Sequence, residues 1–216
     1  SMYRYAMMQY KNYSPSRNEE EAKIYCKKAA DNGHINAMYS YAMILNKNEQ
    51  NKSDNVKEEI KIYLKTAAEN GHVKAMFNFA QLLCKEKENK NLLKEAAKFY
   101  KMAADNGHID AMHFYADLLR NEYIDFGELK AEFPYYYKLA ADNGYVDSMF
   151  CYAEILSKGI GISANKEESA KYYKMAADKG KKEAMLIYTD ILSKGIGVPA
   201  NKKEAKIYIQ MAKNNK

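Results

Sequence analysis

Histidine and cysteine are the residue types in this sequence that are best suited to bind a metal or to act as a nucleophile. Three of the four histidines, His34, His72 and His108, each follow a glycine directly and recur every 36 to 38 residues. Ligands of one zinc ion each lie about 2 Å from it. Histidines from successive helical layers would be about 10 Å apart or more. These three therefore cannot share a metal, and we predict no metal site.

The cysteines give no better case for chemistry. Cys26, Cys84 and Cys151 cannot all pair with one another, so a reducing compartment is the simpler interpretation. Cys26 is expected to be a small apolar filler, because other parts of the pattern have leucine, tyrosine or isoleucine there. The sequence has no H-E-x-x-H motif and no glycine-rich phosphate loop after a strand. We predict no catalytic residue, no cofactor and no enzymatic activity.

The elements that must position these residues are repeated. The phrase KMAADNGHIDAM at 101–112 recurs in related form around four other glycines. The five glycines are Gly33, Gly71, Gly107, Gly144 and Gly180, at intervals of 38, 36, 37 and 36 residues. Such a period is typical of helical solenoids. We predict one repeat array over 1–216, with units 1–36, 37–74, 75–110, 111–147, 148–183 and 184–216, the last one truncated.

Each unit is expected to contain two helices. Residues 75–85 (AMFNFAQLLCK) have the apolar spacing of an amphipathic first helix. Residues 166–180 (KEESAKYYKMAADKG) are typical of the second, with an aromatic residue and an alanine four positions apart on one face. The glycine of each phrase is expected to end the second helix in a left-handed conformation, which makes the phrase a hinge to the next unit. The Asn/Lys/Ser-rich stretch at about 46–57 is the best candidate for a mobile loop.

Composition excludes several classes of function. The net charge is +6, from 34 basic and 28 acidic residues, and neither half of the chain is a basic arm. Strong electrostatic attraction to nucleic acid or to a membrane surface is therefore not indicated. The start, SMYRYAMMQY, lacks a signal-peptide core, and no run of about 18 apolar residues occurs. We expect no membrane insertion and a cytoplasmic location.

Units five and six carry a family pattern. A first helix ends in Lys-Gly-x-Gly-Ile/Val, and a polar turn follows. The second helix contains Tyr-Tyr-Lys-Met-Ala-Ala in unit five and closes on Asp-x-Gly there, before an alanine restarts the pattern. This pattern resembles the Sel-one-like repeat, a variant of the tetratricopeptide superfamily. The resemblance implies an all-α, right-handed α-solenoid of six antiparallel helix pairs without a β-sheet. It also implies a protein–protein interaction scaffold or adaptor; since the chain begins and ends in mid-pattern, we expect a fragment of a larger adaptor or signalling protein.

In the resembled superfamily, the first helices line the concave face that binds partners. The positions that match are the third, seventh, tenth and eleventh residues of each unit. The third position carries mostly rings, which could either form an aromatic ladder along the groove or pack against the preceding second helix. The seventh position changes from methionine through glutamine to acids along the chain, so one end would suit an apolar peptide and the other a basic one. The partner-binding residues predicted in this way are Tyr39, Phe77, His113, Phe150, Met43, Gln81, Asp117, Arg120, Glu154 and Asp190.

The eleventh position forms a lysine column that suits a helix C-terminus, which is more often a solvated edge than a ligand site. It consists of Lys11, Lys47, Lys85, Asn121, Lys158 and Lys194.

Two other functions stay open at this stage. A helical-repeat nucleic-acid binder would need base-reading side chains at fixed positions and a basic concave face. A hydrolase related to the cysteine-rich branch of the family would need the paired cysteines of that branch, which this chain lacks, or acidic, histidine and serine groups converging in a deep pocket. We therefore expect a protein or peptide ligand, no nucleic acid, and weak self-association through the uncapped ends of the array.

Overall fold

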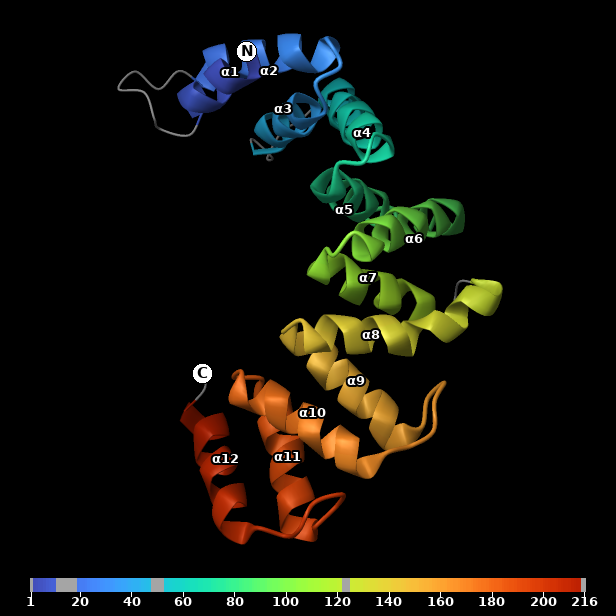
Figure 1. Cartoon of the computed structure of the whole chain (residues 1–216), viewed down its shortest axis with the longest axis vertical. Helices are drawn as coiled ribbons and strands as arrows, with labels where there is room; N and C mark the ends of the chain where they lie inside the picture. Colours follow the sequence, from blue (N-terminus) through green and yellow to red (C-terminus); the bar gives the residue numbers. More distant parts are fainter. Residues whose placement is uncertain (1, 11–18, 48–52, 122–124, 215–216) are drawn as a thin grey trace. The chain divides into compact units, whose positions relative to one another are not determined.

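The computed structural model describes residues 2–10, 19–47, 53–121 and 125–214 (Figure 1). These residues form α-helices and one short 3-10 helix, and no strand occurs among them. The all-α prediction is thus confirmed. The helices are α1 (Met2–Tyr10), α2 (Glu19–Asp31), α3 (Ile35–Lys47), α4 (Asp54–Glu69), α5 (Val73–Leu83), α6 (Lys90–Asp105), α7 (Ile109–Arg120), η2 (Gly127–Glu132), α8 (Phe133–Asp142), α9 (Val146–Lys158), α10 (Lys166–Asp178), α11 (Lys182–Lys194) and α12 (Lys202–Asn214).

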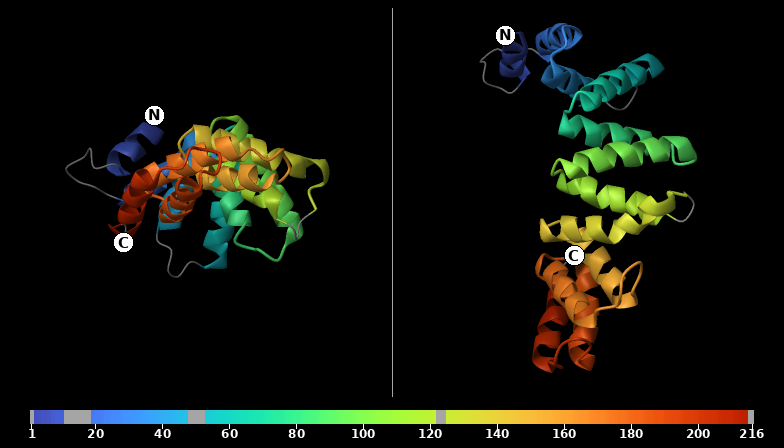
Figure 2. Two further views of the ribbon diagram at one scale, coloured as in Figure 1. Left: turned by 90° about the horizontal axis from the view of Figure 1, so that it is seen from below. Right: turned by 45° about the vertical axis from the view of Figure 1, so that its right-hand side comes forward.

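The chain divides into two compact units that are larger than a single repeat. From here on, unit 1 means Ser1–His108 and unit 2 means Ile109–Lys216, and the shorter sequence units are called repeats. Unit 1 contains the helix pairs α1–α2, α3–α4 and α5–α6, and unit 2 contains α7–α8, α9–α10 and α11–α12. Within a unit, each helix packs on the one before it and the one after it (Figure 2). This is the stacking of an α-helical repeat. That all six repeats over 1–216 form one continuous array remains a prediction.

A perpendicular pair of aromatic rings joins the two helices of every pair. One ring comes from the fifth residue of the repeat and the other from the second helix, and their planes meet at 76° to 89°. In the first five pairs the residue after the first-helix ring is a fully buried alanine, so the helices approach closely beside the rings; in the sixth pair it is the partly buried Thr189. The pairs are Tyr5–Tyr25, Tyr41–Tyr63, Phe79–Phe99, Tyr115–Tyr136, Tyr152–Tyr172 and Tyr188–Tyr208, with centroids 4.8 to 5.0 Å apart.

The hinge phrase ends each second helix as predicted. Gly33 has a φ of +82°, and its N–H donates to the Ala30 carbonyl at 2.9 Å. The N–H of His34 donates to the Ala29 carbonyl at 3.1 Å. These two bonds define a Schellman motif, which satisfies carbonyls that the helix end would otherwise leave free. The same two bonds recur at Gly71, Gly107, Gly144 and Gly180.

The acidic residue of the phrase binds the next second helix. The hydroxyl of Tyr208 donates to Asp178 Oδ1 at 2.5 Å, and Tyr172 donates to Asp142 Oδ1 at the same distance. The hydroxyl of Tyr63 likewise donates to Asp31. In these three hinge phrases, the aspartate therefore connects successive helix pairs near the residue that ends the helix.

The loops inside the pairs differ in structure. Gly159 and Gly195 end α9 and α11 in the left-handed conformation, so the Lys-Gly-x-Gly segments at 158–161 and 194–197 form the turns between the two helices of these pairs. In the fourth repeat the 3-10 helix η2 lies between the two helices of the pair, and Pro134 lies in the first turn of α8. Residues 48–52 of the predicted mobile loop and Lys11 of the lysine column lie outside the described residues.

A methionine occupies the second position of every repeat, and four of these six methionines are buried. They are Met76, Met112, Met149 and Met185, whereas Met38 is only partly buried. Met2, in contrast, has 50% of its surface exposed. None of the described helices is long and apolar enough to span a membrane.

Candidate functional site

Rings at the third repeat position stack on the residue that follows the hinge glycine. Tyr39 lies face to face with His72, with centroids 4.4 Å apart and planes 24° apart. Tyr3 lies 4.5 Å from His34 in a more tilted contact. Each ring therefore reaches the hinge that closes its own repeat. The same contact recurs as Phe77–His108 and, in unit 2, as His113–Tyr145.

Two of the hinge histidines also cap helices. The backbone N–H of Ala75 donates to His72 Nδ1 at 3.1 Å, and that of Ala37 donates to His34 Nδ1 at 3.3 Å. A ring nitrogen that accepts a hydrogen bond is unprotonated, so the cap requires a neutral imidazole. Burial lowers the pKa of His72, which favours that form. The histidines thus serve as structural caps, in agreement with their predicted turn position.

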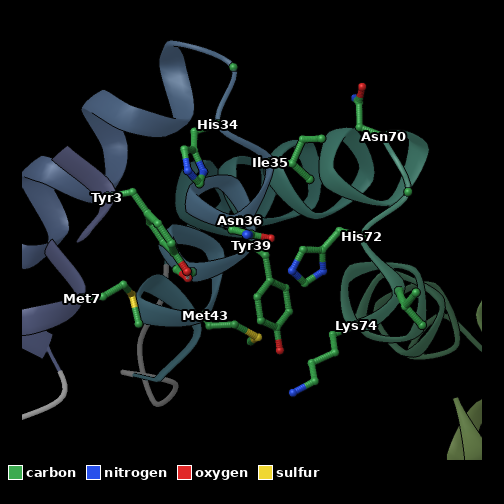
Figure 3. Close-up of a pocket in the computed structure, with 14 residues that line it drawn as sticks. Tyr3, Met7, His34, Ile35, Asn36, Tyr39, Met43, Asn70, His72 and Lys74 are labelled. Atoms are coloured by element: carbon green, nitrogen blue, oxygen red, sulfur yellow. Dashed lines mark hydrogen bonds between the residues drawn. The ribbon is translucent and has the colours of Figure 1, made fainter. Parts of the chain in front are cut away.

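A groove of about 990 Å³ opens in unit 1 along α1, α3 and α5 (Figure 3). Its walls include the predicted partner-binding residues Tyr39 and Met43, together with Tyr3 and Met7 at the matching positions of α1. Figure 3 shows the two tyrosine rings and the two thioethers on the same side of the helices. The first helices of unit 1 therefore present an apolar and aromatic wall to a ligand-sized space.

A smaller cavity of about 270 Å³ shares Met43 with this groove. The predicted residue Gln81 lines it, as does Asn78 of α5. The Asn78 amide donates to Met43 Sδ at 2.9 Å and to the Tyr39 hydroxyl at 3.4 Å. Asn78 therefore links α5 to α3 between the two spaces. The predicted residues Tyr39, Met43 and Gln81 therefore line these two spaces, and their role in partner binding stays a prediction.

Phe77 is placed differently from the prediction. Only 8% of its surface is exposed, and its ring packs between His108 and Tyr100 of α6, with centroids 4.4 and 5.7 Å away. The third position is therefore open in α1 and α3 but filled in α5.

His113 of unit 2 is also buried, with 7% of its surface exposed. Its Nδ1 lies 2.8 Å from Ser148 Oγ, and its Nε2 lies 3.4 Å from Asp117 Oδ2. The Tyr137 hydroxyl donates to the other oxygen of Asp117. Burial lowers the pKa of His113, and the nearby Asp117 carboxylate opposes that shift. Two predicted partner-binding residues are thus joined in one polar cluster of the chain itself.

This cluster has the order acid, histidine, serine that occurs in hydrolases. Ser148 is fully buried, however, so its hydroxyl cannot reach a substrate carbonyl. Cys26 is also fully buried, and burial raises its pKa to about 11, which disfavours the reactive thiolate. No group of three metal-ligating side chains occurs among the described residues. The cluster at His113 is best explained as a buried polar contact between α7 and α9.

The remaining predicted residues of unit 2 lie on first helices and are paired within the chain. Lys158 binds Glu154 at 3.2 Å, and Lys194 binds Asp190 at 2.8 Å, each one helical turn away. The lysines at the eleventh repeat position therefore neutralise part of the negative charge of the acids at the seventh position.

Two further predicted residues of unit 2 contact neighbouring rings and charges. The Arg120 guanidinium lies 5.6 Å from the centre of the Tyr137 ring. Phe150 packs edge-on against Tyr173 and lies under the Lys181 ammonium.

Sequence reasoning missed the hinge residues as part of the groove. His34, Asn36, His72 and Lys74 line it beside the predicted positions. The signal was present, because these residues flank the starts of the helices that follow the repeated glycines. The repeat pattern does not give the direction in which these side chains point, because that direction depends on the orientation of the turn and of the next helix.

Comparisons with known proteins agree with the repeat structure. The family model of the Sel1 repeat matches residues 74–108, 135–145, 146–181 and 183–216. A model of plant tetratrico peptide repeats matches residues 1–63. No curated protein matches the chain.

Two solved structures resemble the chain over almost its whole length. A protective antigen of uropathogenic Escherichia coli that displays an SLR fold is 20% identical, with a TM-score of 0.84 over 99% of this chain and 45% of the antigen. A Sel1 repeat protein from Oxalobacter formigenes is 23% identical, with a TM-score of 0.70 over 98% of this chain and 83% of its own. The chain thus spans less than half of the antigen, and the likeness concerns the fold.

Proposed function

Because the chain belongs to the Sel1 repeat family, whose repeats generally form protein-interaction scaffolds, we propose that it is a non-enzymatic adaptor that binds a protein or peptide on its first helices. The groove of unit 1 carries this proposal. It is lined by two tyrosines and two methionines at the repeat positions that the family pattern assigns to partner binding. Flexible thioethers and flat rings suit the side chains of an extended peptide.

The test is retention of a partner by groove variants. Lysate of the source cells is passed over the native chain and over a Tyr39→Ala/Met43→Ala variant. A control variant, Ile24→Ala/Ile62→Ala, removes two exposed isoleucines from the second helices of the same unit. We expect a partner that the native chain and the control retain and the groove variant loses. Equal retention by all three would contradict the proposal and would place the contact outside this groove.

In unit 2, we propose that Asp117, Glu154 and Asp190 face the basic part of a ligand, as their column suggests. Because Lys158 and Lys194 already pair with Glu154 and Asp190, a basic segment would have to displace these lysines. We therefore expect that replacing all three acids by lysine (Asp117→Lys/Glu154→Lys/Asp190→Lys) weakens partner binding less than Tyr39→Ala/Met43→Ala does. A larger effect of the reversal would make the acidic column the main site.

The free thiols support a reducing location. Cys26, Cys84 and Cys151 form no disulfide. We propose a cytoplasmic location for this part of the chain, which labelling of the cysteines in intact cells would test. Complete oxidation of Cys84 and Cys151 in the cell would contradict it.

A further inference from the structure

The groove of unit 1 has an uneven charge. Neither the groove nor the small cavity beside it is lined by an aspartate or a glutamate among the described residues. Two exposed lysines do line them, Lys74 in the first turn of α5 and Lys85 just beyond its end. Within the described part of the chain, neither ammonium group has an ion-pair or hydrogen-bond partner. The walls therefore combine apolar surface with two available positive charges.

Several other lysines of unit 1 are neutralised within the chain. Lys27 binds Glu59 at 2.7 Å, Lys47 binds Glu19 at 2.9 Å, and Lys65 lies 3.4 Å from Glu95. These pairs join different helices and lie away from the groove walls. The lysines that lack a partner in unit 1 thus include both of those that line the two spaces.

Helix stability does not explain the choice of lysine at position 74. The N-terminal turn of a helix carries partial positive charge, which favours acids and disfavours cations. The matching residue before the other repeat starts is Asn36, Asp110, Asp147 or Glu183. α5 alone among these helices begins with a cation at this position, and it has no acid in its first turn. A contact between Lys74 and a ligand, instead of a contribution to helix stability, would account for the lysine at this position.

We propose that the groove of unit 1 binds an extended acidic segment of a partner protein, with carboxylates at Lys74 and Lys85 and an apolar side chain between them. The inference rests on the proposed function and adds the chemical class of the ligand. Figure 3 shows the Lys74 side chain extending along the groove beside Tyr39, so its ammonium can reach a ligand on that ring.

The spacing of the two lysines defines the ligand further. They are eleven positions apart along α5 and its end, which corresponds to about 16 Å at 1.5 Å per residue. An extended chain advances about 3.3 Å per residue, so the two carboxylates should be about five residues apart. Tyr39 and Met43 lie on α3 beside this path and would contact the residues between the acids.

A displayed library of random peptides tests the charge preference directly. It is selected on the native chain, on Lys74→Glu/Lys85→Glu, on Tyr39→Ala/Met43→Ala and on the control Lys94→Glu/Lys98→Glu. The control lysines are exposed on α6 and line neither space, so the change in net charge is matched. Circular dichroism establishes that all variants keep their helices. One enriched peptide is then synthesised and its affinity measured at low and at physiological salt.

We expect the native chain and the control to enrich acidic peptides and the groove variant to lose them. The affinity of the synthesised peptide should fall about tenfold in the groove variant, because two rim ion pairs are reversed, and it should weaken with salt. Enrichment of neutral or basic peptides that still depend on Tyr39 and Met43 would overturn the acidic preference and leave the proposed function standing. Peptides that bind independently of Tyr39 and Met43, or no enrichment at all, would count against both.

Discussion

Each residue of the hinge phrase has its own partner. In the first hinge, Gly33 takes the left-handed conformation and the Asn32 amide donates to the Lys28 carbonyl at 2.7 Å. The preceding Asp31 accepts from Tyr63 of the next repeat. The residue after the glycine donates to the helix end and supports a ring from the first helix. The phrase is constrained at every position, which explains why it recurs with so little change.

The bond between tyrosine and hinge acid should contribute measurable stability. Tyr208→Phe removes the hydroxyl that binds Asp178 while keeping the ring pair with Tyr188. We expect a loss of about 1 kcal/mol in the free energy of unfolding, measured by urea denaturation. Tyr188→Phe is the matched control, because its hydroxyl has no hydrogen bond among the described residues. Equal effects of the two substitutions would contradict this role.

Two glycines should differ in their tolerance of alanine. A Cβ on Gly33 would meet nothing within 4 Å, so Gly33→Ala has only the strain of its φ of +82°, about 1 kcal/mol. A Cβ on Gly197 would lie 2.3 Å from the Lys166 carbonyl oxygen at the start of α10. Gly197→Ala must move backbone and should cost about 3 kcal/mol or more in thermal or urea unfolding. A Gly197→Ala variant as stable as Gly33→Ala would be inconsistent with this close approach.

At the scale of helices, the third repeat position shows how packing partners decide exposure. Tyr39 of α3 lines the groove, whereas Phe77 of α5 is buried against Tyr100. The end helices show the same rule. Ile207 and Met211 of α12 stay exposed, and so does Met8 of α1.

The helix cap at α5 should make stability depend on pH. The pKa of His72 is lower in the folded chain than its usual value of about 6.5, because the ring is partly buried. The unfolded chain then binds more protons, so stability is full above about pH 6.5 and falls as the pH decreases toward the folded pKa. Protonation also removes the acceptor that caps α5.

We expect His72→Asn, which keeps a capping acceptor but does not titrate, to lose less stability between pH 7 and pH 5 than the native chain. Urea midpoints at the two pH values measure this. The remaining pH dependence includes His113, whose pKa burial also lowers. An unchanged difference in the variant would show that His72 does not contribute.

At the scale of the whole chain, the repeat pattern and the compact units give different divisions. The repeat continues through 101–112 with the same hinge phrase, while the structure separates into Ser1–His108 and Ile109–Lys216. A single array couples each repeat to its neighbours, so a local loss of stability spreads and fades with distance.

A core substitution in unit 1 tests that coupling. Phe79 is 1% exposed, and Phe79→Ala should cost about 3 to 5 kcal/mol. If the chain is one array, amide hydrogen exchange should accelerate in α7 and α8 as well as in unit 1, and less in α11 and α12. Ile62→Ala, at an exposed site of the same unit, is the control. Acceleration confined to residues before 109 would contradict the single array.

The sequence by itself determined the helices, the hinges and the buried rings, because these depend on local signals that repeat. The glycine of each hinge phrase ends a helix in the left-handed conformation, and the spacing of four residues places Tyr208 and Ala212 together on the buried face of α12. Repetition also identified the third and seventh positions, of which Tyr39 and Met43 do line a groove.

The tertiary structure alone decided which equivalent positions are open. Phe77 and Tyr39 occupy the same place in the repeat, yet Phe77 is buried against Tyr100 while Tyr39 lines the groove. His113 is buried beside Ser148 and Asp117. It also decided that Lys158 and Lys194 are paired while Lys74 and Lys85 have no partner among the described residues. Exposure and pairing depend on side chains from neighbouring helices, which a repeat position does not specify.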